Sequence, residues 1–195
     1  MIKLLDILEN KILVPRRSPE ERSKNFLIAT QKKIQQYMKD GSKGDLDLAG
    51  TPITSLPQGL TVGGYLDLIN TLITFLPQGL TVGGDLYLAG TPITSLPQEL
   101  TVGGNLDLYG SKITSLPQGL TVGGYLDLRN TPITTLPQGL TVGGYIYLSN
   151  TKITTLPQGL TVGGSLYLKN TPISKKYSKE QIKQMVPGVK GKITI

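Results

Sequence analysis

Short segments in which apolar and polar residues alternate recur every 20 residues through most of the chain. In each segment two aliphatic side chains are separated by one other residue, as in the pairs Leu46/Leu48 and Leu66/Leu68. An alternation with a period of two predicts a short β-strand with one buried face and one outward face. Seven such strands are expected, beginning at Asp45, Tyr65, Asp85, Asn105, Tyr125, Tyr145 and Ser165.

The nine residues LPQGLTVGG lie between successive strands and repeat with the same period. They begin at Leu56, Leu76, Leu116, Leu136 and Leu156, and the variant LPQELTVGG begins at Leu96. A fixed period of this length is typical of a solenoid, in which stacked neighbours bury what one repeat cannot. The proline removes a backbone donor and the glycine pair disfavours a helix, so an extended or polyproline-like return with tight Gly-Gly corners is expected. Continuous apolar columns inside the coil are expected from Ile53, Leu56, Leu60, Val62 and their equivalents.

Gly or Asn follows each predicted strand, and these residues adopt a positive φ most readily. A left-handed turn is the simplest explanation for their recurrence. We expect it at Gly50, Asn70, Gly90, Gly110, Asn130, Asn150 and Asn170.

Residues 1–43 are expected to form a helical N-terminal cap. Ser18 is a favourable N-cap, Pro19 suits the first helical position, Glu21 completes a capping box and Gly41 can end the helix. These signals predict a helix over 19–39. The apolar residues expected to cover the first open coil are Phe26, Leu27, Ile34, Tyr37 and Met38.

The repeats occupy residues 44–174, and residues 175–195 are expected to form a small C-terminal cap. Ser178 and Gln181 form a second capping box before a short helix that ends at about Met185. The last residues, 192–195, predict a strand that pairs with the end of the sheet. Both ends of a solenoid need such covers to protect the exposed coil edges.

The chain has neither cysteine nor histidine. Disulfides, cysteine nucleophiles, Ser-His-Asp triads and histidine metal sites are therefore excluded. We expect no enzyme activity and no cofactor. The first fifteen residues have apolar character, but charged residues interrupt it, and no apolar run reaches 18 residues, so no membrane segment and a cytoplasmic location are expected.

The net charge of +7 is unevenly distributed along the sequence. Residues 1–43 carry ten basic and five acidic residues, residues 44–170 carry four and seven, and residues 171–195 carry six and one. The repeats are therefore acidic between two basic ends. Because the surface best suited to binding lies in the acidic part, nucleic acid is disfavoured as a partner.

The repeat pattern L-x-L-x-x-[TS]-x-I-x-x-L-P resembles that of leucine-rich repeat proteins, in particular the short bacterial type with 20-residue units. The resemblance covers about 44–174 and implies a parallel sheet whose concave face binds proteins. Two features depart from the family pattern: threonine or serine replaces the usual asparagine column, and Gly-Gly replaces the leucine before the strand. A hydroxyl column could still bond backbone between coils, and a three-sided β-helix remains the alternative coil. The repeats also resemble those of uncharacterised bacteriophage and environmental bacterial proteins.

Variation between repeats concentrates in three columns of outward strand positions, which we interpret as the partner-binding surface. Aspartates dominate the first five strands and tyrosines the last three. Tyrosine offers rigid amphipathic area for recognition, although both residue types also suit a solvated strand face. The candidate partner-binding residues are Asp45, Asp47, Tyr65, Asp67, Asp85, Tyr87, Asp107, Tyr109, Tyr125, Asp127, Arg129, Tyr145, Tyr147, Tyr167 and Lys169.

Three functions remain open from the sequence. The first is a non-catalytic module that binds a protein or peptide, for instance a basic one, on the strand face. The second is a structural or assembly component, such as a phage particle protein, that docks through basic ends containing Arg16, Arg17, Lys175, Lys176 and Lys179. The third is carbohydrate binding by the tyrosine and aspartate surface. Carboxylates expected on neighbouring strands, Asp47 with Asp67 and Asp107 with Asp127, also suit a glycosidase pair or a Ca²⁺ site, but an open sheet offers no enclosed cleft for either.

Overall fold

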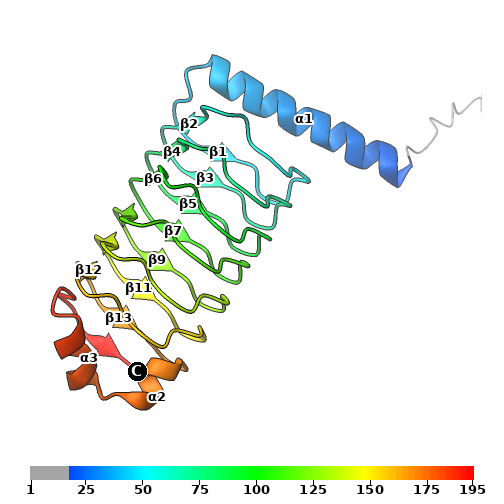
Figure 1. The fold of residues 1–195 in the computed structure, drawn as a ribbon. Coiled ribbons are helices and arrows are strands. Elements are labelled where there is room, and N and C mark those ends of the chain that lie inside the picture. Colours follow the sequence, from blue (N-terminus) through cyan, green and yellow to red (C-terminus); the bar gives the residue numbers. More distant parts are fainter. Residues whose placement is uncertain (1–17) are drawn as a thin grey trace, which may run out of the picture.

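Each 20-residue repeat forms one turn of a parallel β-solenoid in the computed structural model, which describes residues 18–195. The turns stack in one direction, with helix α1 (Pro19–Lys39) across one end and helices α2 (Pro172–Lys176) and α3 (Lys179–Met185) at the other (Figure 1). The repeat period and the parallel strands agree with the solenoid predicted from the sequence.

One strand from every repeat joins an eight-stranded parallel sheet, completed by a strand from the C-terminal end. Neighbouring strands pair residues that are 20 positions apart, for example Leu46 with Leu66. The strands are shorter than the alternating segments suggested, with two residues each. Their order is β1 (Leu46–Asp47), β3 (Leu66–Asp67), β5 (Leu86–Tyr87), β7 (Leu106–Asp107), β9 (Leu126–Asp127), β11 (Ile146–Tyr147), β13 (Leu166–Tyr167) and β14 (Ile193–Thr194).

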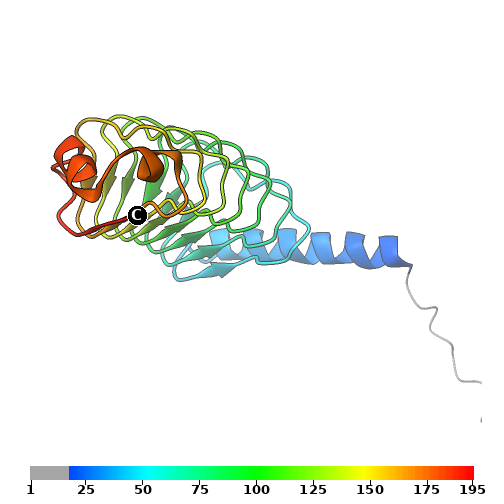
Figure 2. The same ribbon diagram turned by 90° about the horizontal axis from the view of Figure 1, so that it is seen from below.

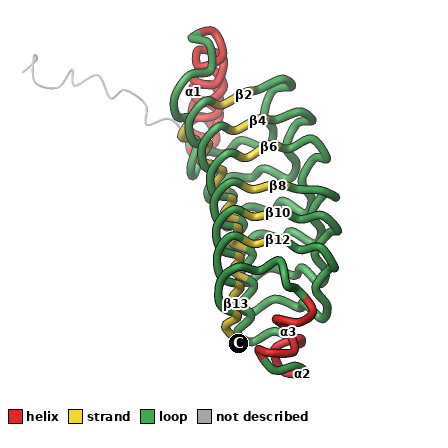
Figure 3. The backbone as a smooth tube through the Cα atoms, turned by 90° about the vertical axis from the view of Figure 1, so that its left-hand side faces the viewer, coloured by secondary structure: helices red, strands yellow, loops and turns green. Residues whose placement is uncertain are grey.

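A second parallel sheet, which was not predicted from the sequence, lies in the return segments (Figure 3). Its strands alternate an outward threonine with a buried valine. The prediction of an extended or polyproline-like return was therefore incomplete, because two residues are too short a segment to show a strand period. The six strands are β2 (Thr61–Val62), β4 (Thr81–Val82), β6 (Thr101–Val102), β8 (Thr121–Val122), β10 (Thr141–Val142) and β12 (Thr161–Val162).

The core is a set of aliphatic columns that run through the stack. Leu46, Ile53, Leu60 and Val62 are almost fully buried, and so are their equivalents in later repeats. Leu56 and most of its equivalents line the same core with slightly greater exposure. The predicted columns are therefore confirmed. Each repeat supplies only a thin layer, so burial depends on contact with its neighbours.

The glycine pairs allow the coils to approach one another closely. A Cβ atom on Gly83 would lie 2.4 Å from the carbonyl oxygen of Gly63, and one on Gly103 would lie 2.2 Å from that of Gly83. The amide of Gly84 donates to the carbonyl of Gly64 at 2.9 Å. Steric contact between coils thus explains the repeated pair better than the tight corner expected from sequence.

The left-handed turn after each strand is confirmed in all seven repeats, with φ between 55° and 69°. The hydroxyl column that follows it bonds differently from the expectation. In five repeats a buried threonine donates to the leucine carbonyl three residues earlier in its own coil, as Thr71 does to Leu68 at 2.8 Å. The hydroxyls therefore stabilise the turn within a coil and do not connect one coil to the next.

Helix α1 begins and ends where the sequence predicted, and both halves of its capping box are formed. Ile34 is buried against the first coil and Leu27, Tyr37 and Met38 pack beside it, but Phe26 is 50 % exposed, so its predicted covering role is wrong. The N-terminal part of the helix extends past the coils (Figure 2), and residues 19–26 are all exposed.

The C-terminal end combines predicted and unpredicted elements. The capping box of Ser178 and Gln181 starts α3, and β14 pairs in parallel with β13, as expected. Helix α2 was not predicted, because it starts within the last repeat. There Thr171 acts as its N-cap and Pro172 occupies the first helical position.

Candidate functional site

The outward positions of the eight-stranded sheet form a continuous surface, which we call the strand face. Three columns run along it, one before each strand, one at its second residue and one after it. The second column follows directly from the strand register and contains Asp47, Asp67, Tyr87, Asp107, Asp127, Tyr147 and Tyr167. The first contains Asp45, Tyr65, Asp85, Tyr125 and Tyr145, and the third contains Tyr109, Arg129 and Lys169.

Acidic and amide side chains of the first column bond the next coil. Asp45 accepts the backbone N–H of Tyr65 at 2.9 Å, and Asp85 accepts that of Asn105 at 2.7 Å. Asn105 continues the series by accepting the N–H of Tyr125 at 2.9 Å. These side chains therefore stabilise the stack, a role that was not predicted from the sequence.

Each aspartate of the second column bonds its own turn. The Oδ1 atoms of Asp47, Asp67, Asp107 and Asp127 accept the backbone N–H two residues later at 2.9 to 3.0 Å. This is the local bond by which Asp favours turns. Asp67 and Asp107 make no other hydrogen bond through their carboxylates within residues 18–195, so each keeps an oxygen that can accept from a partner.

Arg129 is held flat on the strand face by a carboxylate and two rings. Its Nε and Nη2 atoms donate to Asp127 Oδ2 at 2.9 and 2.5 Å. The guanidinium carbon lies 5.4 Å from the ring centroid of Tyr109 and 5.2 Å from that of Tyr147, which are cation–π distances. Arg129 belongs to the third column, whereas Asp127 and Tyr147 belong to the second. The sequence therefore did not reveal that the Arg129 side chain contacts residues of the second column.

Four tyrosines, Tyr125, Tyr145, Tyr147 and Tyr167, form what we call the tyrosine cluster. Tyr147 and Tyr167 are stacked with ring centroids 4.9 Å apart and an interplanar angle of 16°. Tyr145 tilts against both of these rings, and Tyr125 meets the ring of Tyr147 edge on at 6.0 Å. The register places Tyr147 beside Tyr167 and, through the pairing of Leu126 with Ile146, Tyr125 beside Tyr145. The ring of Tyr125 nevertheless contacts that of Tyr147.

The environment of the strand face shifts the pKa of two aspartates in opposite directions. Burial raises the pKa of Asp107, and the neighbouring Asp127 adds to this effect. Burial also acts on Asp85, but hydrogen bonds from Asn105 and from the Tyr87 hydroxyl outweigh it and lower the pKa of Asp85. The Tyr87 hydroxyl donates to Asp85 Oδ2 at 2.6 Å, and this bond raises the pKa of Tyr87 strongly.

Carboxylates on neighbouring strands lie in register, as predicted for Asp47 with Asp67 and for Asp107 with Asp127. The second pair is unsuited to paired acid and nucleophile chemistry, because Arg129 occupies the Asp127 carboxylate. In the part of the chain that the structure describes, no group of three acidic side chains is arranged to hold a metal ion.

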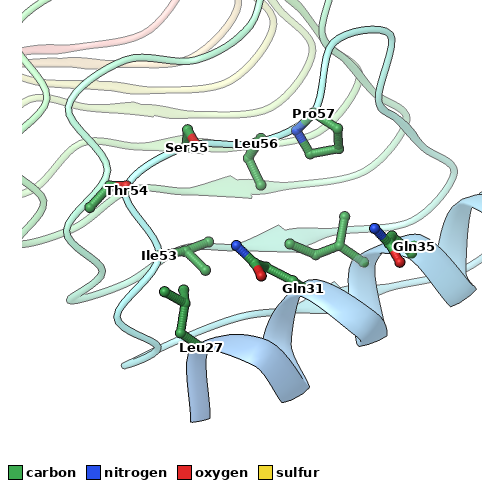
Figure 4. A pocket seen from close by; sticks show the side chains of 9 residues that line it. Leu27, Gln31, Gln35, Ile53, Thr54, Ser55, Leu56 and Pro57 are labelled. Atoms are coloured by element: carbon green, nitrogen blue, oxygen red, sulfur yellow. The ribbon is translucent and has the colours of Figure 1, made fainter. Parts of the chain in front are cut away.

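A groove of about 390 Å³ lies between α1 and the first coil (Figure 4). Leu27 and Ile34 of the helix face Ile53, Leu56 and Pro57 of the coil, and Gln31 and Gln35 line its helix side. The sequence predicted this junction only as a cap. No charged side chain lines the groove, so it offers little to select a partner.

Two exposed apolar side chains of the second coil were also missed. Leu72 and Phe75 are each 55 % exposed, and Phe75 lines a second recess of about 250 Å³. Other repeats carry proline or lysine in place of Leu72, and serine, threonine or, in the last repeat, lysine in place of Phe75. This break in the repeat was the signal that could have revealed them, but it lies outside the strand positions on which the prediction was based.

Comparison with protein-family models and with curated protein sequences gives no match for this chain. None of the helices within residues 18–195 is long and apolar enough to span a membrane. The basic residues Arg16 and Arg17, proposed as part of a docking end, lie outside the described residues.

Proposed function

We propose that the chain is a non-catalytic leucine-rich repeat module that binds a protein or peptide across its strand face. The observation that carries this proposal is the ordered series Tyr109, Arg129, Tyr147 and Tyr167, one planar group from each of four successive coils. Aromatic and arginine side chains with restricted motion are the residues that most often anchor protein interfaces.

Exposure supports the same function. Tyr109 and Tyr145 are 44 % and 46 % exposed. If these tyrosines contributed only to the stability of the solenoid, deeper burial of their rings would stabilise it more. The strand backbone beneath them is fixed on both sides by its neighbours, so the surface needs little reorganisation on binding. The leucine-rich repeat assignment rests on the 20-residue period, the L-x-L strand and the position of the proline.

Selection from a random peptide library would test the proposal, because it does not require the partner to be identified first. The wild-type protein is the bait, and selected peptides are measured against Tyr147→Ser/Tyr167→Ser. Phe75→Ser is the matched control, because it also exchanges an exposed aromatic residue for serine but lies on a return segment. All three proteins are first shown to fold by circular dichroism.

The proposal predicts that selected peptides lose at least about tenfold in affinity for the double variant, since central anchors contribute about 2 kcal/mol each. Their affinity for Phe75→Ser should change by less than about twofold. A selection that yields no binder, or binders that tolerate the double variant, would contradict binding through this part of the strand face.

A second candidate function is assembly through the C-terminal end. Lys175, Lys176 and Lys179 are all exposed there, and β14 lies at the edge of its sheet. Such a component would self-associate or bind an acidic neighbour through this end, and variants of the tyrosine cluster would leave that association unchanged. Carbohydrate binding by the stacked rings is the third candidate, and a glycan array distinguishes it from peptide binding.

A further inference from the structure

Tyr87 lies on the strand face between two carboxylates. The sheet register places Asp67 beside it on one neighbouring strand and Asp107 beside it on the other. We call these three residues the Tyr87 seat. The hydroxyl of Tyr87 is tied to Asp85, and its ring meets the ring of Tyr65 edge on at 6.2 Å. Its orientation is therefore fixed from two sides.

The chain itself shows how this surface holds a cation. Arg129 rests against the rings of Tyr109 and Tyr147 while its guanidinium bonds Asp127. The Tyr87 seat also combines an aromatic ring with carboxylates, but it has one ring and two carboxylates where Arg129 has two rings and one carboxylate. Among residues 18–195, neither Asp67 nor Asp107 forms an ion pair with a lysine or arginine of the chain.

Charge along the strand face also selects a cation at this place. Asp45, Asp47, Asp67, Asp85 and Asp107 precede the neutral Asp127–Arg129 pair, and Lys169 lies at the far end. A basic group is thus attracted to the first four strands, β1 to β7, and repelled from β13. The raised pKa of Asp107 agrees with a carboxylate that an added positive charge would stabilise.

We propose that the partner is a basic, extended peptide segment whose lysine or arginine side chain binds the Tyr87 seat, while its following residues lie on the tyrosine cluster. This inference rests on the proposed function and specifies the class of partner. Five strand spacings of about 4.8 Å separate Asp67 from Tyr167, which gives about 24 Å. At about 3.3 Å per residue, an extended segment of seven to eight residues spans that distance.

Three acetylated and amidated octapeptides provide the test: Lys-Thr, Gln-Thr and Glu-Thr, each repeated four times. Binding to the uniformly ¹⁵N-labelled full chain is followed by amide chemical shifts, which detect millimolar affinities. The lysine peptide should shift the amides of Tyr87, Asp107 and Tyr109, and the glutamate peptide should not. Raising NaCl from about 50 to about 300 mM should weaken the lysine peptide severalfold, because screening reduces the attraction.

The deciding variant is Asp67→Asn/Asp107→Asn. Asparagine keeps an oxygen that can accept the turn N–H, just as Asn105 accepts a backbone N–H of the next coil where Asp45 and Asp85 do, so the fold should be retained. The double variant should weaken the lysine peptide at least about fivefold, because it removes both carboxylates of the Tyr87 seat. Glu99→Gln, a single charge removed on a return segment, is the control and should change the affinity by less than about twofold.

Equal binding of the lysine and glutamine peptides, unchanged binding to the double variant, or no shift at about 1 mM peptide would each overturn the inference. Failure of this kind remains distinct from failure of the proposed function. If library selection yields neutral peptides that require Tyr147 and Tyr167, the strand face binds peptides but the Tyr87 seat does not select a cation.

Discussion

Thr91 and Ser111 occupy the same position in successive coils, but only the threonine hydroxyl is hydrogen bonded. Thr91 donates to the carbonyl of Leu88 at 2.7 Å, whereas the buried hydroxyl of Ser111 has no partner. Both residues are 2 % exposed. The methyl group of threonine restricts χ1, and serine, which lacks it, does not hold its hydroxyl in the bonding rotamer. A buried unpaired hydroxyl is costly.

Ser111→Thr should therefore increase the free energy of unfolding by about 1 kcal/mol, through one hydrogen bond and one buried methyl group. Urea unfolding followed by circular dichroism measures the change. Thr91→Ser is the reciprocal control and should lose a similar amount. A serine-to-threonine exchange that destabilises the protein would show that the fourth coil has no room for the methyl group.

The pH dependence of stability should change in opposite directions in two asparagine variants. The pKa of Asp107 is raised in the folded state, so its ionisation costs stability as pH rises through that pKa. Asp107→Asn should be more stable than the wild type at pH 7, and the difference should shrink below the ordinary carboxyl pKa of about 3.9.

The pKa of Asp85 is lowered, so the ionised carboxylate contributes stability above the ordinary carboxyl pKa and loses it as pH falls through the lowered value. Asp85→Asn should be less stable than the wild type at pH 7, with a difference that also shrinks in acid. Urea midpoints measured at about pH 7 and about pH 3 compare the two variants. The same sign of change at pH 7 in both would contradict the electrostatic description of the strand face.

The coil could be predicted from the sequence because every repeat places the same residue types at the same buried and turn positions. Columns such as Ile53 and Leu60, and the positive φ at Asn70, are each fixed by residue type and period alone. The second sheet escaped prediction because Thr61 and Val62 give only one alternation. Its existence depends on hydrogen bonds to the next coil, which no local pattern encodes.

The strand face was predicted as a set of columns, but its chemistry depends on contacts between columns. The contact of Arg129 with Tyr147 joins the third column of one coil to the second column of the next. The aspartates were predicted to contact a partner or to keep the strand face solvated, yet Asp45 also bonds the following coil. Both contacts depend on the direction in which a side chain points. The spacing of residues along the chain does not determine that direction.

Glu99 replaces a glycine that has a positive φ in the other returns, such as 69° at Gly79 and Gly119. Glu99 itself does not adopt a positive φ, so its turn differs from the others. The following strands lose a pair: β6 and β8 join only through Val102 and Val122, and an open recess of about 620 Å³ lies beside them. Leu100 is 6 % exposed, more than any equivalent leucine.

Glu99→Gly should restore the pairing of Thr101 with Thr121 and slow hydrogen exchange of the Thr121 amide at least about tenfold, because a local opening is closed. Global stability should change by less than about 1 kcal/mol, since the entropy cost of glycine offsets the new hydrogen bond. Gly119→Glu is the reciprocal control and should increase exchange of the Thr141 amide, which donates to Leu120 at 3.0 Å. If hydrogen exchange of the Thr121 amide is unchanged, the turn at Glu99 is not the cause of the missing strand pair and the recess.

Removal of the Arg129 guanidinium should leave Asp127 without its counter-charge. Asp127 is 3 % exposed and lies in register with Asp107. Arg129→Met should cost about 1–3 kcal/mol, less than a fully buried pair because Arg129 is half exposed. Asp127→Asn/Arg129→Met should recover much of this loss, since asparagine keeps the turn acceptor. A double variant as unstable as Arg129→Met would assign the effect to lost ring contacts of the arginine.

Deletion of one complete coil, residues 105–124, should yield a folded and shorter solenoid. The cut joins Gly104 to Tyr125, so Asp85 meets the N–H of Tyr125 in place of that of Asn105, and Leu86 pairs with Leu126 instead of Leu106. Every column keeps its register because the period is preserved, and stability should fall only by the contribution of one coil and its interface.

Deletion of 105–114 is the decisive control, because it also removes β7 from the eight-stranded sheet but takes out only half of a period. The return of the fourth coil would then follow directly after Gly104, and the aliphatic columns would fall out of phase with their neighbours. We expect the 20-residue deletion to retain the circular dichroism spectrum and a cooperative thermal transition, and the ten-residue deletion to lose the transition. If the complete-coil deletion also unfolds, the stack depends on interactions beyond nearest neighbours, and the strand face cannot be varied one coil at a time.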